Sequence, residues 1–154
     1  TYGIRVYNPS QKITGVIIRN IRLTNWHTGI YFQNVDSGTI ENSTVTNNQD
    51  CGICLLNSDA NTLRNNTLSS NNIFGIKLTG GADGDVISEK TINSQGQGIQ
   101  VGKDGSPADN NKIRNNTISA NKLGIDVERS VGLIIENNTN YDSPQKPLGY
   151  SRYP

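Results

Sequence analysis

The residues most capable of chemistry occupy one position in six short stretches, which read GIRV, GIYF, GICL, GIKL, GIQV and GIDV. Each stretch alternates apolar residues with a residue whose type varies, as in a β-strand with one buried and one exposed face. The variable positions are Arg5, Tyr31, Cys54, Lys77, Gln100 and Asp126. Such side chains could bind a polysaccharide by stacking and hydrogen bonding. They could also supply a base and a charge-neutralising group for removing the proton beside a uronate carboxylate.

A second exposed row lies two residues further along each strand and adds Glu128 to the candidates. The residues that we expect to bind substrate are Arg5, Tyr31, Lys77, Gln100, Asp126 and Glu128. The candidates for a catalytic role are Tyr31, Lys77, Asp126 and the single histidine, His27. A lone histidine beside a strand is more often a polar surface residue than a catalyst, so both interpretations of His27 stay open.

These stretches belong to a repeat that extends over most of the chain. The six Gly-Ile pairs are separated by 26, 23, 23, 23 and 26 residues. A constant period with occasional three-residue additions predicts a solenoid whose loops accept insertions. A second aliphatic column follows at Ile18, Ile40, Leu63, Ile87, Ile113 and Ile135, and a third lies at Leu23, Val45, Leu68, Ile92 and Ile118.

The three aliphatic columns predict three short strands in each coil. Gly, Asn, Ser and Thr fill the spaces between them, and strong helix formers are scarce. The leucine-rich repeat pattern is absent, so we predict an all-β fold, a parallel β-helix of about six coils of ~23 residues. Coils stacked about 4.8 Å apart would place Lys77 and Asp126 about 10 Å from one another, which favours an extended binding surface over a compact triad.

Asparagine, with 22 residues, forms columns of its own. One column comprises Asn20, Asn42, Asn65, Glu89, Asn115 and Asn137, and the other comprises Asn48, Asn71, Gln95 and Asn121. Stacked amides can hydrogen-bond to one another and to turn backbone, and asparagine tolerates the left-handed backbone of a corner. The N-x-S/T sequons at Asn42, Asn65, Asn115 and Asn137 make glycosylation an alternative. We favour the scaffold role because a stacked corner amide is poorly accessible.

An aspartate column raises the question of a metal. It comprises Asp36, Asp59, Asp83 and Asp109, each four residues before the second aliphatic column. The simplest interpretation is a set of Asx-turns, in which each carboxylate accepts a nearby backbone N–H. Because hard cations prefer carboxylate oxygens, the alternative is a calcium or sugar-hydroxyl site. We expect no cofactor to be required, with calcium as the open possibility.

Composition limits the classes of partner. The chain has 14 basic and 13 acidic side chains, which gives no support to nucleic-acid binding. No apolar run is long enough to cross a membrane, and residues 1–20 lack a signal peptide, so the protein is either cytoplasmic or has lost a leader. Cys51 and Cys54 form a lone C-x-x-C without a second pair for zinc, and we expect them to be structural thiols.

The stretches GICLLNSDANTLRNNTLSSN at 52–71 and NNKIRNNTISANKLGIDV at 110–127 resemble right-handed parallel β-helix repeat proteins. That group includes NosD-type carbohydrate-binding repeats, mannuronan C5-epimerases and pectate-lyase-like enzymes. The resemblance implies a right-handed solenoid and an acidic polysaccharide as ligand or substrate, handled outside the cell, at its surface or in the periplasm. The Asp-Pro-His-Asp or Asp-Pro-His-Glu motif expected of the epimerases is absent, so no catalytic residue is transferred.

The two ends of the repeat suggest how the chain is organised. We expect a β-helix domain at 1–140 and an irregular tail at 141–154. The first Gly-Ile strand begins without an amphipathic cap, which predicts end-to-end stacking of copies or a larger protein of which this is a piece. The leading hypothesis is an extracellular β-helix that binds or processes polysaccharide, as a lyase, epimerase or hydrolase if it is an enzyme. The competing hypothesis is a structural rod or surface-layer module that self-associates.

Overall fold

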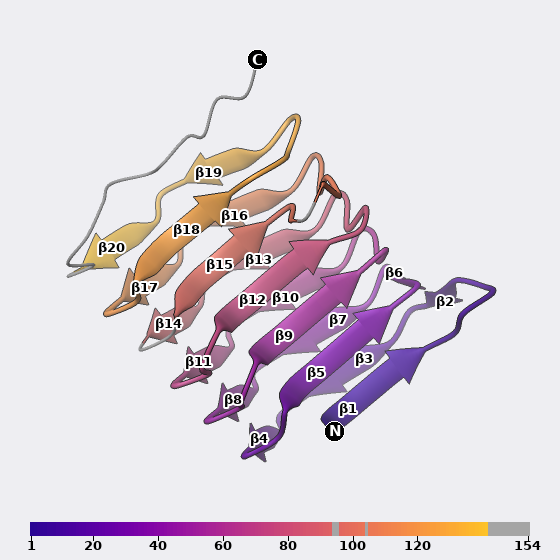
Figure 1. The fold of residues 1–154 in the computed structure, drawn as a ribbon, viewed down its shortest axis with the longest axis horizontal. Helices are drawn as coiled ribbons and strands as arrows, with labels where there is room; N and C mark the ends of the chain where they lie inside the picture. Colours follow the sequence, from indigo (N-terminus) through magenta and orange to yellow (C-terminus); the bar gives the residue numbers. More distant parts are fainter. Residues whose placement is uncertain (94–95, 104, 142–154) are drawn as a thin grey trace.

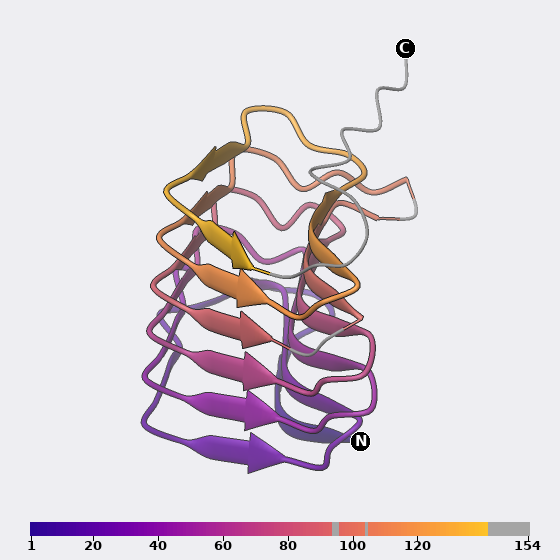
Figure 2. The same ribbon diagram turned by 90° about the vertical axis from the view of Figure 1, so that its left-hand side faces the viewer.

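The computed structural model of the chain describes residues 1–93, 96–103 and 105–141, with side chains up to residue 139. The described residues form coils that stack from the N-terminal end to the C-terminal end, each coil contributing one strand to each of three sheets (Figure 2). The predicted all-β solenoid of three strands per coil is confirmed. The predicted tail at 141–154 lies outside the described residues except for its first position.

All three main sheets are six-stranded and parallel, and Figure 1 views the first of them from outside. The first sheet has the order β1 (Tyr2–Tyr7), β5 (Thr28–Gln33), β9 (Cys51–Leu56), β12 (Phe74–Thr79), β15 (Gln97–Val101) and β18 (Leu123–Val127). The second has the order β3 (Ile17–Arg19), β7 (Thr39–Glu41), β10 (Thr62–Arg64), β13 (Val86–Ser88), β16 (Lys112–Arg114) and β19 (Ile134–Glu136). The third has the order β4 (Arg22–Thr24), β8 (Thr44–Thr46), β11 (Thr67–Ser69), β14 (Thr91–Asn93), β17 (Thr117–Ser119) and β20 (Thr139–Tyr141). A short pair joins β2 (Ile13–Thr14) to β6 (Val35–Asp36).

The aliphatic columns of the repeat are the core. Ile30 pairs in register with Ile53, and Ile53 with Ile76, so that identical side chains stack from coil to coil. These side chains have no exposed surface, as expected for a thin core filled by all three sheets. The glycine of each Gly-Ile pair lets the coils approach closely, since a Cβ at Gly29 would lie 2.7 Å from the carbonyl oxygen of Gly52.

The first asparagine column occupies the corners of the coils. The prediction that its amides form a ladder is wrong. Its members from Asn20 to Asn137 have φ between 51° and 57° and are exposed. Asparagine is favoured there because its short polar side chain tolerates the left-handed backbone. The low accessibility on which we ranked glycosylation second is therefore also wrong, and glycosylation at these positions stays a prediction.

The amide ladder instead lies one residue later, on the inside of the corner. Asn66 is buried, its Oδ1 accepts the N–H of Ser43 at 2.9 Å, and its Nδ2 donates to the carbonyl oxygen of Ile40 at 2.8 Å. Asn116 repeats this geometry two coils later by donating to Ile87 at 3.1 Å. Each amide thus satisfies two backbone groups of the coil before it, which fixes the spacing of the coils.

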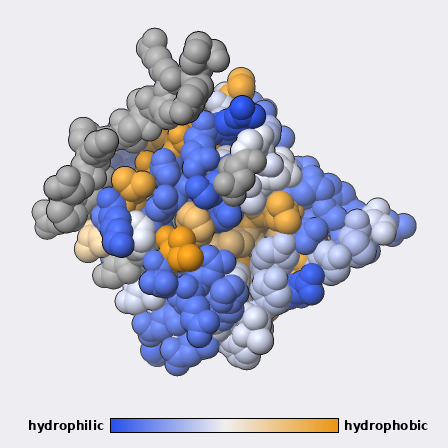
Figure 3. Space-filling model, viewed as in Figure 1, coloured by the Kyte–Doolittle hydropathy of each residue, from blue (hydrophilic) through white to orange (hydrophobic). Residues whose placement is uncertain are grey.

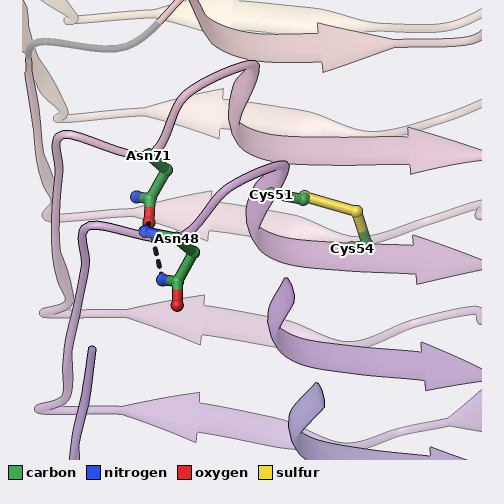
Figure 4. The surroundings of a disulfide bond; sticks show 4 residues. All are labelled: Asn48, Cys51, Cys54 and Asn71. Atoms are coloured by element: carbon green, nitrogen blue, oxygen red, sulfur yellow. Dashed lines mark hydrogen bonds between the residues drawn. A yellow bond between two sulfur atoms is a disulfide. The ribbon is translucent and has the colours of Figure 1, made fainter. Parts of the chain in front are cut away.

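The second asparagine column is a buried ladder, as predicted. Asn48 donates its Nδ2 to Asn71 Oδ1 at 2.7 Å, as Figure 4 shows. Asn71 in turn donates to the carbonyl oxygen of Val45 at 3.1 Å, and Asn121 is equally buried. The predicted member Gln95 lies outside the described residues.

The two adjacent asparagines of the RNNT stretch provide a matched pair for measuring the ladder. Replacing Asn66 with Ala leaves two buried backbone groups without their partners, so we expect the free energy of unfolding to fall by about 2–4 kcal/mol. Replacing Asn65 with Gly keeps the left-handed corner available and should change it by less than about 0.5 kcal/mol. Urea unfolding of both variants measures the difference. A larger loss at Asn65 than at Asn66 would contradict this assignment of the ladder.

Two ladder positions carry titratable residues in place of asparagine. Asp85 follows Asn61 in a third ladder, and its Oδ1 accepts the Asn61 N–H at 2.7 Å. Lys90 follows Asn66 in the corner ladder. Among the described residues, Asp85 Oδ2 and Lys90 Nζ are buried without a hydrogen-bond partner. Both positions therefore depart from an otherwise satisfied pattern.

Candidate functional site

The varied row predicted from the sequence lies on the outside of the first sheet. Tyr31, Cys54 and Lys77 are register partners on β5, β9 and β12, so they stand side by side across three coils. Figure 3 looks onto this face and shows apolar side chains gathered in its middle among hydrophilic ones. The face therefore combines a local apolar area with polar groups at its border.

A pocket of about 230 Å³ opens on this face. Its lining includes Tyr2, His27, Tyr31, Asp50, Cys54 and Lys77. The structure thus brings together three of the four candidate catalytic residues, His27 and Tyr31 from the coil of β5 and Lys77 from β12, two coils further on. Tyr2 and Asp50 also line the pocket and were not among our candidates.

Aromatic rings and a guanidinium form a platform at the N-terminal border of the pocket. The ring centroids of Tyr2 and Tyr31 are 5.0 Å apart. The guanidinium carbon of Arg5 lies 4.1 Å from the centroid of the Tyr7 ring and 5.2 Å from that of Tyr2. Cation–π contact holds this cation in place while its N–H donors still reach solvent, since Arg5 is exposed.

Tyr31 joins the platform to the rest of the pocket. Its hydroxyl donates to Gln33 Oε1 at 2.9 Å. Burial raises the pKa of Tyr31, as does the neighbouring Tyr2, whereas the charge of Arg5 lowers it by less. The phenol therefore stays protonated at neutral pH and acts as a hydrogen-bond donor rather than as a base.

Lys77 supplies a second cation at the opposite side of the pocket. Its Nζ lies 5.0 Å from the centroid of the Phe74 ring. Among the described residues, neither Lys77 nor Arg5 forms an ion pair, whereas Lys12, Arg64 and Lys103 each do. Both charges are thus available to an anionic ligand.

The two cysteines are not free thiols, and our expectation of structural thiols is wrong. Cys51 and Cys54 form a disulfide within β9, with 6.2 Å between their Cα atoms (Figure 4). Cys51 is the first residue of β9, where the chain bends into the strand, so the two side chains reach one another across three positions. The sequence pattern treats the strand as straight and would place these side chains on opposite faces.

The remaining predicted binding residues lie away from this pocket. Gln100 belongs to the same outward row but has no exposed surface, and its Nε2 donates to the carbonyl oxygen of Gly102 at 2.9 Å. Glu128 pairs with Lys103 at 2.8 Å. Asp126 on β18 is the register partner of Gln100. Burial and the charge of Glu128 raise the pKa of Asp126. These three residues do not line the pocket that contains Tyr31 and Lys77.

The aspartate column forms a ladder between coils rather than the predicted turns within one coil. Asp36 Oδ1 accepts the N–H of Asp59 at 2.9 Å, and Asp83 Oδ1 accepts that of Asp109 at 2.6 Å. Lys12 Nζ lies 2.9 Å from Asp36 Oδ1 and 3.0 Å from Asp59 Oδ2, so an ammonium already neutralises the first pair. The described residues contain no group of three or more His, Cys, Asp or Glu side chains placed to hold a metal. Calcium binding at this column stays a prediction.

Residues 2–151 match the family described as right handed beta helix region. The chain belongs to this family. The periplasmic alginate epimerase AlgG has a similar fold, with a TM-score of 0.72 and 18% identity, over 90% of this chain and 36% of the epimerase chain. A double mutant of that epimerase matches with the same TM-score and identity over 89% of this chain and 36% of its own. No protein of curated function matches the sequence.

These similarities extend to the fold of the β-helix family and not to a site. At 18% identity the chain spans only 36% of the length of the epimerase. No helix among the described residues is long and apolar enough to cross a membrane. What the protein binds must therefore be argued from its own outward face.

Proposed function

We propose that the protein binds an acidic polysaccharide across the outward face of the first sheet, outside the cell, at its surface or in the periplasm. The observation that carries this proposal is the pocket between Tyr2, Tyr31 and Lys77. It has aromatic rings at one side and, at the other, a cation that forms no ion pair with any described residue. Sugar rings stack their apolar C–H faces on aromatic side chains, and Lys77 and Arg5 would bind uronate carboxylates. A disulfide in the pocket wall supports an oxidising compartment.

The parallel strands suit a polymer better than a small sugar. Neighbouring coils repeat every ~4.8 Å, so Arg5, Tyr31 and Lys77 follow one another along the axis of the solenoid. Asp50 adds an acceptor for a sugar hydroxyl at the edge of the pocket. A similar fold is found in an alginate epimerase, which is in line with a uronate polymer as the ligand.

A chemical step on the bound uronate would use the same pocket. Lys77 would neutralise the carboxylate, and His27 would be the base that removes the adjacent proton, because Tyr31 is kept protonated by burial. Release of unsaturated uronate, or exchange of the C5 proton with deuterium from the solvent, would reveal such a step.

Exchange of a single lysine tests the binding proposal. We expect Lys77→Gln to weaken binding to a polyuronate of defined length about tenfold, which corresponds to about 1.4 kcal/mol. Lys112→Gln removes the same charge from the exposed face of the second sheet and should change the Kd less than about twofold. Calorimetric titration with alginate and pectate oligomers, and with a carboxyl-reduced polymer as control ligand, measures both. Equal effects of the two substitutions would mean that any binding is nonspecific charge attraction.

A further inference from the structure

A small apolar cluster lies on the outer side of the first sheet, separate from the main core inside the coils. It consists of Cys51, Cys54 and Phe74, with Tyr31 packed against it. The Cys51–Cys54 disulfide is the centre of this cluster, and Cys54 is also part of the pocket wall. The disulfide is therefore packed in the cluster and also reaches the pocket.

The disulfide is not what holds the coils together. Cys51 pairs in register with Thr28 and Phe74, and Cys54 pairs with Tyr31 and Lys77, so the backbone ladder of β9 is complete on both sides. The bond joins residues only three positions apart within one strand and crosses no boundary between coils. A crosslink that closes so short a segment restricts the unfolded chain little. Its reduction should therefore leave the solenoid folded.

The two sulfurs differ in how they can be approached. Cys51 has no exposed surface, whereas Cys54 is 8% exposed and lines the pocket. The register partner of Cys54 on β12 is Lys77, whose ammonium lies against the Phe74 ring of the same cluster. A cation in the same pocket stabilises the Cys54 thiolate that forms or departs during exchange.

We propose that this pocket is a site of thiol–disulfide exchange, in which the Cys51–Cys54 disulfide accepts two electrons from an external dithiol. One thiolate of the dithiol attacks Cys54 Sγ and forms a mixed disulfide, while Cys51 Sγ leaves with the electron pair of the broken bond and takes up a proton. The second thiolate of the dithiol then attacks the first sulfur of the dithiol, which is bonded to Cys54 in the mixed disulfide. This attack releases Cys54 as a thiolate. The protein is reduced by two electrons, and the dithiol leaves as a disulfide. This proposal does not depend on the polysaccharide function.

Reduction under native conditions tests the proposal first. The intact protein is equilibrated with mixtures of reduced and oxidised dithiothreitol, quenched with acid and alkylated, and the alkylated cysteines are counted by mass spectrometry. We expect both cysteines to be reduced while the circular dichroism of the β-sheet is unchanged. Reduction that occurs only in urea, together with loss of the β-sheet signal, would overturn the proposal.

Single-cysteine variants test which sulfur reacts. Cys51→Ser leaves Cys54 free and Cys54→Ser leaves Cys51 free, and circular dichroism confirms that each is folded. With dithiobis(nitrobenzoate) as the disulfide reagent, we expect Cys54 to react at least about tenfold faster than Cys51. Adding Lys77→Gln to Cys51→Ser should move the midpoint of the rate against pH upward, and adding Lys112→Gln should not. Equal reaction rates, or faster reaction at Cys51, would overturn the assignment of Cys54 as the attacked sulfur.

Discussion

Replacing Asp85 with Asn should stabilise the protein, and the gain should grow as the pH rises. Burial raises the pKa of Asp85 from its ordinary value near 3.8 to about 8 in the folded protein, although hydrogen bonds from Asn61 act in the opposite direction. The folded state therefore keeps a proton that the unfolded chain releases above pH ~4. The contribution of Asp85 to the free energy of unfolding is therefore fully present below pH ~4 and is lost as the pH rises toward 8.

The ladder geometry explains why asparagine fits this position. Asn61 Nδ2 donates to the carbonyl oxygen of Val35 at 3.0 Å, and Asn111 Nδ2 donates to that of Ala82 at 2.9 Å. By the same spacing, we expect an amide at residue 85 to donate to the carbonyl oxygen of Ser58, three residues before Asn61. An asparagine amide can donate there at every pH, whereas Asp85 Oδ2 is buried without a hydrogen-bond partner in the described part of the chain.

The size of the effect follows from the linkage between proton binding and folding. The difference in unfolding free energy between Asp85→Asn and the natural protein should grow by about 1.4 kcal/mol per pH unit, or about 4 kcal/mol from pH 4 to pH 7. Urea unfolding at several pH values measures it, with the exposed Glu136→Gln as control. A difference that does not vary with pH would show that Asp85 is ionised in the fold.

Replacing Lys90 with Met should also stabilise the protein, with the opposite dependence on pH. Lys90 is 2% exposed, and burial lowers its pKa well below 10.5, while the charge of Glu89 raises it slightly. The unfolded chain binds a proton that the folded state releases, so stability increases as the pH rises toward 10.5. Methionine keeps an unbranched side chain of similar length and removes the amine.

We expect Lys90→Met to raise the unfolding free energy at pH 7 by about 1–3 kcal/mol, because no buried amine is left without a partner. The gain should shrink between pH 7 and pH 10, over the range in which the gain from Asp85→Asn is large. Lys112→Met, on the exposed face of β16, is the matched control and should change stability by less than about 0.5 kcal/mol. A loss of stability at pH 7 would indicate that the Lys90 amine has a partner that stabilises it.

The sequence predicts the coils well because the same physical requirement recurs in each of them. Ile53 and Ile76 are buried only by the coils above and below, so the repeat of aliphatic residues is itself the fold. The asparagine ladder was placed one residue early because Asn65 and Asn66 are adjacent and identical. A shift of one position exchanges an exposed corner for a buried ladder, and composition does not distinguish them.

The candidate site was predicted only in part, because it depends on contacts between coils rather than on the repeat. Tyr31 and Lys77 were found as departures from a regular column. Tyr2 precedes its Gly-Ile pair and was missed, although its place opposite Thr28 in the register marks the same border of the sheet. The disulfide was missed because it depends on the bend at the first residue of β9.

The place at which a uronate oligomer binds is the most direct test of the central claim. Nuclear magnetic resonance titration of the isotope-labelled protein with an alginate or pectate oligomer reports which residues change their surroundings. We predict that the largest shift changes fall on the outward face of β1, β5, β9 and β12, at Tyr2, Tyr31 and Lys77. Shift changes confined to the second or third sheet, or none at saturating concentrations of both oligomers, would contradict the assignment of this face as a polysaccharide-binding surface.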